Sequence, residues 1–254
     1  MQKITVPKQP KSTSRTSRTF SRHDIAKQRK TCYTSAMRKV VSFDLDGTLV
    51  NGIFGDMVWN RGVPEEYAKK YSMTFDEAKA LITKQYESVG DGNILWYEIE
   101  YWLKRFDLPV TAKELLERYE GCIEPLPGAK EVIEKLKGTY TLVIASNAAR
   151  IFVEKELEHA GLTHHFSHII SATTDYRMIK KDPEFYKRLC LTLNVSHVEI
   201  VHVGDHKVFD FEVPSALGIE AYYLSSRQMA DGRQPEGKGN GRTIYGLTEL
   251  LDKL

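Results

Sequence analysis

Short apolar runs that alternate with helical patterns are the feature that most constrains the fold of this 254-residue chain. A run that is near-continuously apolar and β-branched is typical of a strand buried on both faces of a parallel sheet. Parallel strands need crossover connections, which are right-handed and usually helical. The sequence therefore predicts an α/β fold with a Rossmann-like parallel sheet. The predicted strands cover residues 39–43, 140–146, 167–173, 198–205 and 220–225, and the helices between them cover 128–138, 148–161, 182–194 and 211–218.

Residues 52–122 interrupt this alternation, because the strand pattern disappears there and three or four helical patterns follow. In one of them Thr111 and Glu114 have the spacing of a capping box. We therefore expect an all-helical cap domain, residues 52–122, inserted after the first strand. The Rossmann-like core would consist of residues 37–51 and 123–254. The main helical patterns of the insertion are residues 74–90, 93–106 and 111–121.

Residues 1–36 differ in composition from the rest of the chain. They contain nine Lys or Arg and eleven Ser or Thr, Asp24 is their one acidic residue, and they have no hydrophobic periodicity. Such a segment has too few apolar residues to offset its ordering entropy, so we predict a disordered basic extension. A transit peptide and a nucleic-acid-binding arm are alternatives, but the amphipathic and aromatic patterns that they require are missing. A chain that starts at Met37 is then expected to keep its stability and activity.

The remaining composition excludes several classes of protein. A content of 41% hydrophobic and 28% charged residues is that of an ordinary globular protein. The three cysteines are far apart, so neither a disulfide framework nor a zinc knuckle is indicated, and a reducing, cytoplasmic setting is expected. No apolar stretch of eighteen or more residues occurs, so the sequence predicts no membrane span.

Polar, chemically reactive residues follow the predicted strands. In open parallel sheets, ligands bind beyond the carboxyl ends of the strands, so these residues are candidates for one site. They are Asp44, Asp46 and Thr48 after the first strand, Ser146 and Asn147 after the second, Lys180 shortly after the third, and Asp205 and Asp210 after the fourth.

These residue types suit the transfer of a phosphoryl group. A phosphate about 4 Å from a carboxylate is repelled by several kcal/mol at an effective dielectric constant of about 20, so converging aspartates need a cation to bind it. Mg²⁺ takes oxygen ligands and stabilises the charge that develops in the transition state. Lys180 and the hydroxyl groups of Thr48 and Ser146, beside Asn147, would hold the other phosphoryl oxygens. The sequence therefore predicts Mg²⁺ as the cofactor.

Other motifs explain the first strand end less well. A calcium loop of the EF-hand type needs glycine at its sixth position and glutamate at its twelfth, whereas here Gly47 is fourth and Gly55 is twelfth. The P-loop, the dinucleotide-binding glycine motif and the nucleophile elbow are absent from the sequence. A simple Asp-Gly turn accounts for Asp46 and Gly47 but leaves Asp44 unexplained.

Four segments in this order, DLDGTL, SN, KKDPEFY and GDHKVFD, resemble the motifs of the haloacid dehalogenase superfamily of phosphohydrolases. The resemblance covers residues 39–224. The insertion resembles the helical cap of the branch that contains phosphoglycolate phosphatase and β-phosphoglucomutase.

The resemblance implies a role for each matched residue. Asp44 would be the nucleophile that forms an aspartyl-phosphate, and Asp46 would be the general acid and base. Ser146 would bind the phosphoryl group, and Lys180 would balance the charge. Because the family's phosphotransferases carry an acid two residues after the nucleophile, Asp46 argues against dehalogenation. The implied magnesium ligands are Asp44, the backbone carbonyl of Asp46, Asp205 and, in support, Asp210.

Two departures from the family pattern bear on these roles. Lys181 stands where the third motif usually has proline, so either Lys180 or Lys181 could supply the amine, and the register with DPEFY favours Lys180. In the fourth motif, His206 and Phe209 replace residues that are often small or polar.

The histidines and aromatic residues are expected to have structural roles. His202 lies inside the fourth strand, where a hydrogen-bonded core residue is expected. Aromatic residues at helical spacing are more often core than pocket residues. A structural role is expected for the histidines in a helix-to-strand connection, at 159, 164, 165 and 168. A core role is expected for the aromatic residues of the insertion, Trp59, Tyr97, Tyr101 and Trp102.

The sequence thus predicts a Mg²⁺-dependent hydrolase of a small phosphomonoester, acting through an aspartyl-phosphate. The partner would be a small phosphorylated metabolite, whereas nucleic acid is not favoured and the oligomeric state is left open. Two alternatives remain: a phosphomutase of the β-phosphoglucomutase type, and a catalytically silent binding or regulatory protein whose basic tail contacts nucleic acid.

Overall fold

The computed structural model describes residues 38–179, 181–225 and 241–254. These residues all belong to one compact unit of the chain, residues 37–254. The predicted N-terminal extension, residues 1–36, lies outside the described residues, and so does Lys180.

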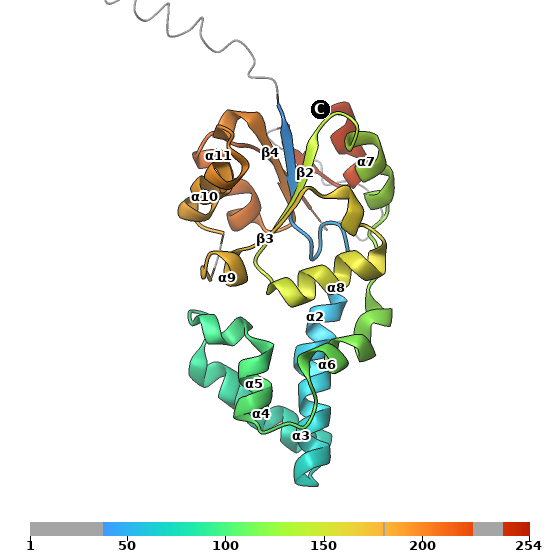
Figure 1. The fold of residues 1–254 in the computed structure, drawn as a ribbon, viewed down its shortest axis with the longest axis vertical. Helices are drawn as coiled ribbons and strands as arrows, with labels where there is room; N and C mark the ends of the chain where they lie inside the picture. The colour runs from blue at the N-terminus through green and yellow to red at the C-terminus, as the bar shows by residue number, and fades with distance from the viewer. Residues whose placement is uncertain (1–37, 180, 226–240) are drawn as a thin grey trace, which may run out of the picture. The chain divides into compact units, whose positions relative to one another are not determined.

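A six-stranded parallel sheet forms the centre of the fold, with the order β3-β2-β1-β4-β5-β6 (Figure 1). The predicted α/β class is therefore confirmed. The first five strands lie within the predicted ranges, whereas β6 has only two residues and was missed. The strands are β1 (Val40–Phe43), β2 (Thr141–Ser146), β3 (His168–Ser171), β4 (Ile200–Gly204), β5 (Glu220–Leu224) and β6 (Thr243–Ile244).

The register of the central strands brings their carboxyl ends to one edge of the sheet. Phe43 of β1 is level with Ile144 of β2 on one side and with Val203 of β4 on the other. Strand order reverses at this point, because the chain adds β2 and β3 on one side of β1 and β4 to β6 on the other. Such a switch point is where open α/β sheets form their ligand site.

Both faces of the sheet are covered by helices, which explains why most residues of its strands are apolar and buried. Val143 of β2 packs with Phe185 in one apolar cluster, while Leu142 and Ile144 pack with Phe152 in a second. Alternate residues of one strand therefore belong to two cores, as the pleat requires. The helices of this part are α7 (Ala129–Leu136), α8 (Arg150–Ala160), α9 (Ala172–Asp175), α10 (Pro183–Leu193) and α11 (Val213–Ala216), with short π or 3₁₀ turns at Thr163–His165, His197–Glu199, Lys207–Glu212 and Leu247–Asp252.

The insertion between β1 and β2 is helical, as predicted. Two of its helices begin with capping boxes: Thr111 with Glu114, which was predicted, and Thr74 with Glu77, which was not. The helices are α2 (Ile53–Met57), which continues through a π-helical turn (Val58–Gly62) into α3 (Val63–Tyr71), then α4 (Phe75–Val89), α5 (Ile99–Arg105) and α6 (Ala112–Tyr119), with 3₁₀ turns at Ile94–Tyr97 and Glu120–Cys122.

The single helix predicted over residues 93–106 is wrong, because the chain breaks at Glu98. Asn93 caps a 3₁₀ turn by accepting a hydrogen bond from the Leu95 amide at 3.0 Å. The indole of Trp102 then donates to the carbonyl of Trp96 at 3.2 Å, so that α5 folds back on this turn. The Asn93 cap and a side-chain hydrogen bond between residues six positions apart thus override a continuous helical pattern.

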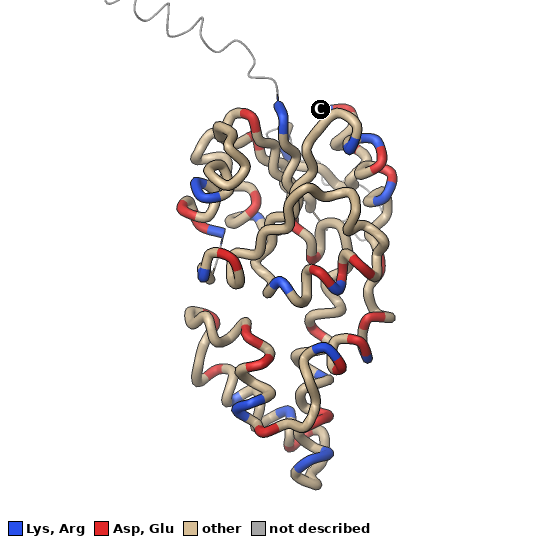
Figure 2. The backbone as a smooth tube through the Cα atoms, in the orientation of Figure 1, with Lys and Arg blue, Asp and Glu red and all other residues tan. Residues whose placement is uncertain are grey.

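Acidic and basic residues are interspersed along the helices, as Figure 2 shows. Several pair with a residue of opposite charge four positions away, such as Lys135 with Glu131 at 2.7 Å. Among the described residues, none of the helices combines the length and the apolar character that a bilayer span requires.

Candidate active site

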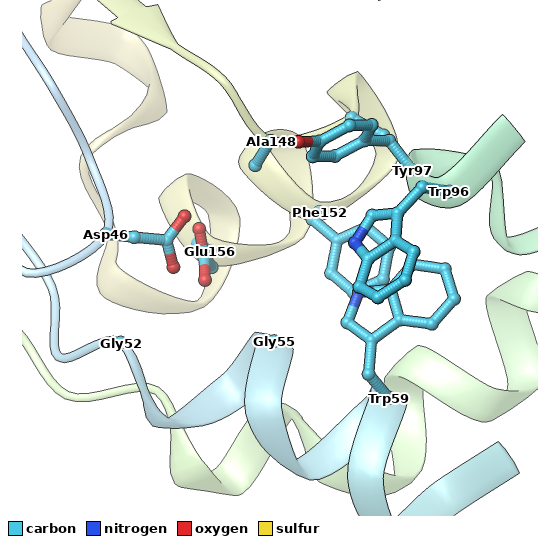
Figure 3. A pocket seen from close by; sticks show the side chains of 10 residues that line it. Asp46, Gly52, Gly55, Trp59, Trp96, Tyr97, Ala148, Phe152 and Glu156 are labelled. Carbon is cyan, nitrogen blue, oxygen red and sulfur yellow. The ribbon is translucent and has the colours of Figure 1, made fainter. Parts of the chain in front are cut away.

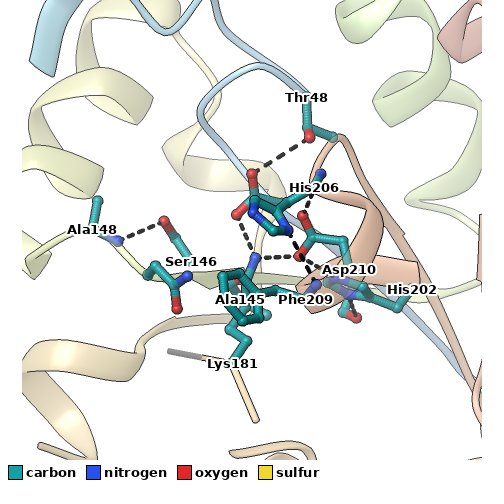
Figure 4. Close-up of polar contacts among 12 residues, drawn as sticks. Thr48, Ala145, Ser146, Ala148, Lys181, His202, His206, Phe209 and Asp210 are labelled. Carbon is teal, nitrogen blue, oxygen red and sulfur yellow. Dashed lines mark hydrogen bonds and ion pairs between the residues drawn. The ribbon is translucent and has the colours of Figure 1, made fainter. Parts of the chain in front are cut away.

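Asp44 directly follows β1, and each of its two carboxylate oxygens has a neighbouring donor group. The residue is 7% exposed, and its carboxylate accepts a hydrogen bond from the ammonium of Lys181 at 2.6 Å, with the Thr48 hydroxyl 3.5 Å from its other oxygen (Figure 4). Its amide donates to the carbonyl of Val203 at 2.9 Å, which fixes the backbone. Burial raises the pKa of Asp44 to about 8, although Lys181 works in the opposite direction.

Lys181, not the favoured Lys180, is the lysine that the described residues place at this site. Its side chain is 2% exposed, and its ammonium lies 2.6 Å from Asp44, 2.5 Å from Asp210 and 3.1 Å from the carbonyl of Ala145. Burial lowers the pKa of Lys181, but the two carboxylates outweigh it, and the net shift is upward. The next residue, Asp182, caps α10, so Lys181 directly precedes the start of this helix.

Asp210 is locked in place by its hydrogen bonds. It is 1% exposed and accepts from the imidazole of His202 at 3.2 Å and from the amide of His206 at 3.0 Å. His202 is in turn 2.7 Å from the hydroxyl of Ser42, so it is a hydrogen-bonded core residue, as expected. Burial raises the pKa of Asp210, but Lys181 and His202 outweigh it and bring the pKa below its usual range. This carboxylate is therefore ionised.

Three carboxylates converge beside Lys181. Asp44, Asp205 and Asp210 each offer an oxygen, and these oxygens lie within 4.8 Å of one another. Among the described residues this is the only group of three or more His, Cys, Asp or Glu side chains so arranged, and the histidines at 159–168 form none. All the donors are carboxylate oxygens, the ligand type that Mg²⁺ prefers, so the residues fit a hard divalent cation.

The carboxylate of Asp205 lies directly against the backbone at Gly47, where there is no room for a side chain. Gly47 has a φ of +74°, and a Cβ there would lie 2.3 Å from Oδ2 of Asp205. We expect Gly47→Ala to lower the free energy of unfolding by about 1–3 kcal/mol, since both the backbone and the carboxylate are strained. Urea unfolding measures this loss.

The matched control for this prediction is Gly138→Ala. Gly138 is exposed, and a Cβ there would meet nothing within 4 Å. An unfolding free energy of Gly47→Ala equal to that of Gly138→Ala would contradict the close approach.

Asp46 lies two residues after Asp44 and faces a second carboxyl group, that of Glu156 in α8 (Figure 3). Burial raises the pKa of Asp46. Burial and the neighbouring Asp46 raise the pKa of Glu156 to about 11, so Glu156 is protonated at neutral pH. The two groups therefore share at least one proton next to the carboxylate cluster.

Ser146 and Asn147 follow β2 at the same edge of the sheet. The hydroxyl of Ser146 accepts a hydrogen bond from the amide of Ala148 at 3.1 Å (Figure 4). The side-chain oxygen of Asn147 is buried, and no described residue hydrogen-bonds it. The strand ends thus bring the predicted residues to one region, except for Lys180, which lies outside the described residues.

A pocket of about 280 Å³ opens beside Asp46, between the insertion and α8. Glu156, Trp96 and Phe152 line it, and the sequence patterns identified none of the three as site residues. The sequence does contain a sign that Glu156 is unusual. It lies on the buried stripe of α8, between Phe152 and Ala160, where an apolar residue is expected. Trp102 lies in the core and Tyr101 and Trp59 pack against it, as expected. Trp59 also lines the pocket, and so does Tyr97.

Comparison with known proteins identifies the family. Residues 38–218 match the haloacid dehalogenase-like hydrolases. The GMP/IMP nucleotidase YrfG of Escherichia coli is 29% identical over 137 residues, which are 53% of this chain and 60% of that protein. The chain thus spans about 60% of the length of this curated relative.

Solved structures share the fold. A phosphatase of the family from Thermococcus onnurineus is 25% identical, with a TM-score of 0.68 over 85% of this chain and 97% of the other. A 2-haloacid dehalogenase from Pseudomonas syringae has a TM-score of 0.60 at 18% identity, again over 85% and 97%, and at this identity it shows the fold alone. Since the family match spans most of the sequence and includes the ends of β1, β2 and β4, from which the site residues follow, the chain belongs to the haloacid dehalogenase-like hydrolases.

Proposed function

We propose that the protein is a Mg²⁺-dependent hydrolase of small phosphomonoesters that acts through an aspartyl-phosphate on Asp44. The observation that carries this proposal is the buried Asp44 carboxylate between the Lys181 ammonium and two further aspartates. Hydrolysis of phosphate monoesters is among the slowest uncatalysed reactions, so it needs both a positioned nucleophile and charge neutralisation.

A bound Mg²⁺ would be held by Asp44, Asp205 and the backbone carbonyl of Asp46, with Asp210 in support, and would neutralise charge on the phosphoryl oxygens. Lys181 holds one oxygen of Asp44, at 2.6 Å, and thereby orients the carboxylate. An oxygen of Asp44 attacks phosphorus while the bond to the leaving oxygen breaks, and Asp46 gives that oxygen a proton. Asp46 then takes a proton from the water that cleaves the aspartyl-phosphate. Ser146, Asn147 and Thr48 would hydrogen-bond the phosphoryl group.

Asp46 distinguishes this reaction from dehalogenation. A halide leaves without needing a proton, whereas an alkoxide needs a proton from a nearby acid. The raised pKa of Asp46 suits that role. A phosphomutase would use the same first step, and incubation with a sugar phosphate followed by product analysis separates the two, since a mutase gives an isomeric sugar phosphate rather than inorganic phosphate.

Removal of divalent metal is expected to lower phosphate release from p-nitrophenyl phosphate by about 100-fold or more, because the metal supplies several kcal/mol of transition-state stabilisation. The measurement compares the protein in excess EDTA with the same sample after Mg²⁺ is added back in excess over the chelator. Turnover that is the same in EDTA and in Mg²⁺ would refute the proposed cofactor.

The catalytically silent alternative makes the opposite prediction for the same assay, since it gives no turnover with either sample. The activity for which the Escherichia coli relative is named makes nucleoside monophosphates one substrate class for a screen at fixed Mg²⁺.

A further inference from the structure

The pocket beside Asp46 has a polar end and an aromatic end. Asp46 and Glu156 lie at one end, and Trp59, Trp96 and Tyr97 lie with Phe152 at the other (Figure 3). Asp46 is the group that would protonate the leaving oxygen, so a leaving group bound at the cluster extends into this pocket. A role for the pocket in binding that group rests on the proposed function, because the leaving group belongs to the same reaction.

Glu156 points to a ligand at the polar end. It is 1% exposed, and apart from the Asp46 carboxyl group that it faces, no described residue hydrogen-bonds either of its carboxyl oxygens. Leaving a buried polar group unsatisfied costs about 1–3 kcal/mol, so an apolar residue would be the better choice for packing alone. A hydroxyl group on the leaving group, close to the ester bond, would satisfy this carboxyl.

The aromatic end is shaped for a flat ring. The rings of Trp59 and Phe152 are nearly parallel, at 13°, with centroids 5.6 Å apart, and Trp96 and Tyr97 stand beside them. These side chains come from three separate elements: the π-helical turn Val58–Gly62, the 3₁₀ turn Ile94–Tyr97 and α8. Stacking of a planar base on aromatic side chains is worth about 1–3 kcal/mol per base.

Two glycines keep the space between the ends open. Gly52 and Gly55 both line the pocket, and a Cβ at either would meet nothing within 4 Å. A side chain at Gly55, within α2, would therefore grow into free space rather than into neighbouring atoms. At about 280 Å³ the pocket is near the lower end of small-molecule sites, which span about 300–1,000 Å³, so it suits a leaving group of a few rings and no polymer.

We propose that this pocket binds the nucleoside part of a nucleoside 5′-monophosphate. A ribose hydroxyl would hydrogen-bond Glu156, and the base would stack at the aromatic end formed by Trp59, Trp96, Tyr97 and Phe152. Glu156 is thus a specificity residue for the leaving group. A phosphomonoester with neither a hydroxyl near the ester nor a ring would use the cluster at Asp44 alone.

The first test fills the pocket. Gly55→Leu is expected to lower kcat/KM for inosine 5′-monophosphate at least tenfold, while kcat/KM for ethyl phosphate changes less than threefold. Gly121→Leu is the matched control, because Gly121 is exposed, a Cβ there meets nothing within 4 Å, and it does not line the pocket. An equal loss for both substrates in Gly55→Leu would overturn the proposal.

The second test measures binding without hydrolysis. All three tryptophans lie in the insertion, at 59, 96 and 102, and two of them line the pocket. Inosine, which has no phosphate, is expected to quench the tryptophan fluorescence of the wild-type protein saturably, and Gly55→Leu is expected to weaken its binding at least tenfold. Absence of quenching in the wild type would overturn the proposal even if phosphatase activity is present. Quenching without any phosphate release would instead contradict the proposed function.

Variants of Glu156 separate a contact with the ligand from an effect through Asp46. Glu156→Gln keeps a hydrogen-bonding side chain of the same size and is expected to bind inosine within threefold of the wild type. Glu156→Leu is expected to weaken inosine binding at least fivefold and to lower kcat/KM more for the nucleotide than for ethyl phosphate. A loss by the same factor for both substrates, with inosine binding unchanged, would show that Glu156 acts only on Asp46 and would overturn its role in specificity.

Discussion

Replacement of Asp44 by asparagine is expected to lower kcat for any phosphomonoester by about 10⁴-fold or more, because the amide cannot attack phosphorus and losing a catalytic nucleophile has effects of this size. Asparagine has nearly the same shape as aspartate, so the replacement keeps the packing of this buried side chain. The amide oxygen of the new side chain can still accept the hydrogen bond from Lys181. The measurement is phosphate release at saturating substrate and Mg²⁺, with urea unfolding of the same samples.

Asp252→Asn is the matched control for this substitution, since Asp252 is exposed and lies in the C-terminal turn Leu247–Asp252. It is expected to keep wild-type activity. An Asp44→Asn protein that folds and retains more than a tenth of the wild-type kcat would rule out Asp44 as the nucleophile.

Replacement of Lys181 by methionine is expected to cost about 3–5 kcal/mol in the free energy of unfolding at pH 7, because it leaves two buried carboxylates without their cation. Asp44 and Asp210 both lose the ammonium that lies 2.6 and 2.5 Å away. Activity should fall as well, since the carboxylate of Asp44 loses the group that orients it. Urea unfolding at several pH values measures the loss of stability.

The pH dependence of this loss has a defined sign. Without Lys181 the pKa values of the two carboxyls rise in the folded state, so the folded protein binds protons more readily than the unfolded chain does. An acid with a raised folded pKa destabilises the protein above its unfolded pKa, and the penalty shrinks as the pH falls. The difference between Lys181→Met and the wild type should therefore be smaller at pH 5 than at pH 7.

Lys180→Met is the control that distinguishes the two adjacent lysines, and we expect it to affect stability and activity little. If Lys180→Met abolishes activity while Lys181→Met keeps it, the favoured sequence register was right and the assignment to Lys181 fails.

Much of the fold and part of the site could be predicted from local sequence patterns. Near-continuously apolar runs such as residues 39–43 predict buried parallel strands, because a strand covered on both faces does not alternate apolar and polar residues. The rule that ligands bind at the carboxyl ends of such strands then selects Asp44, Asp205 and Asp210 as neighbours, although more than 150 residues separate Asp44 from the other two along the chain. The family resemblance adds roles that the pattern alone does not contain.

Other features depend on contacts that the helical and strand patterns do not encode. The break at Glu98 comes from the Asn93 cap and from the hydrogen bond between Trp102 and Trp96. Helical spacing also does not distinguish the pocket aromatics Trp59 and Tyr97 from the buried Trp102. Helical periodicity says that a residue faces a neighbouring element, but it does not say whether that neighbour fills the space or leaves a cavity.

The sequence by itself therefore determined the parallel sheet, the helical insertion and the carboxylates at the strand ends, because strand burial and strand direction are properties of short segments. Only the tertiary structure decided that the ammonium of Lys181 lies between Asp44 and Asp210, and that Glu156 faces Asp46 at the mouth of an aromatic pocket. The physical reason is that a sequence pattern does not tell which of two adjacent lysines faces the aspartates, because this depends on how the chain enters α10 at the Asp182 cap. In the same way, the place of Glu156 depends on how α8 packs against the end of β1.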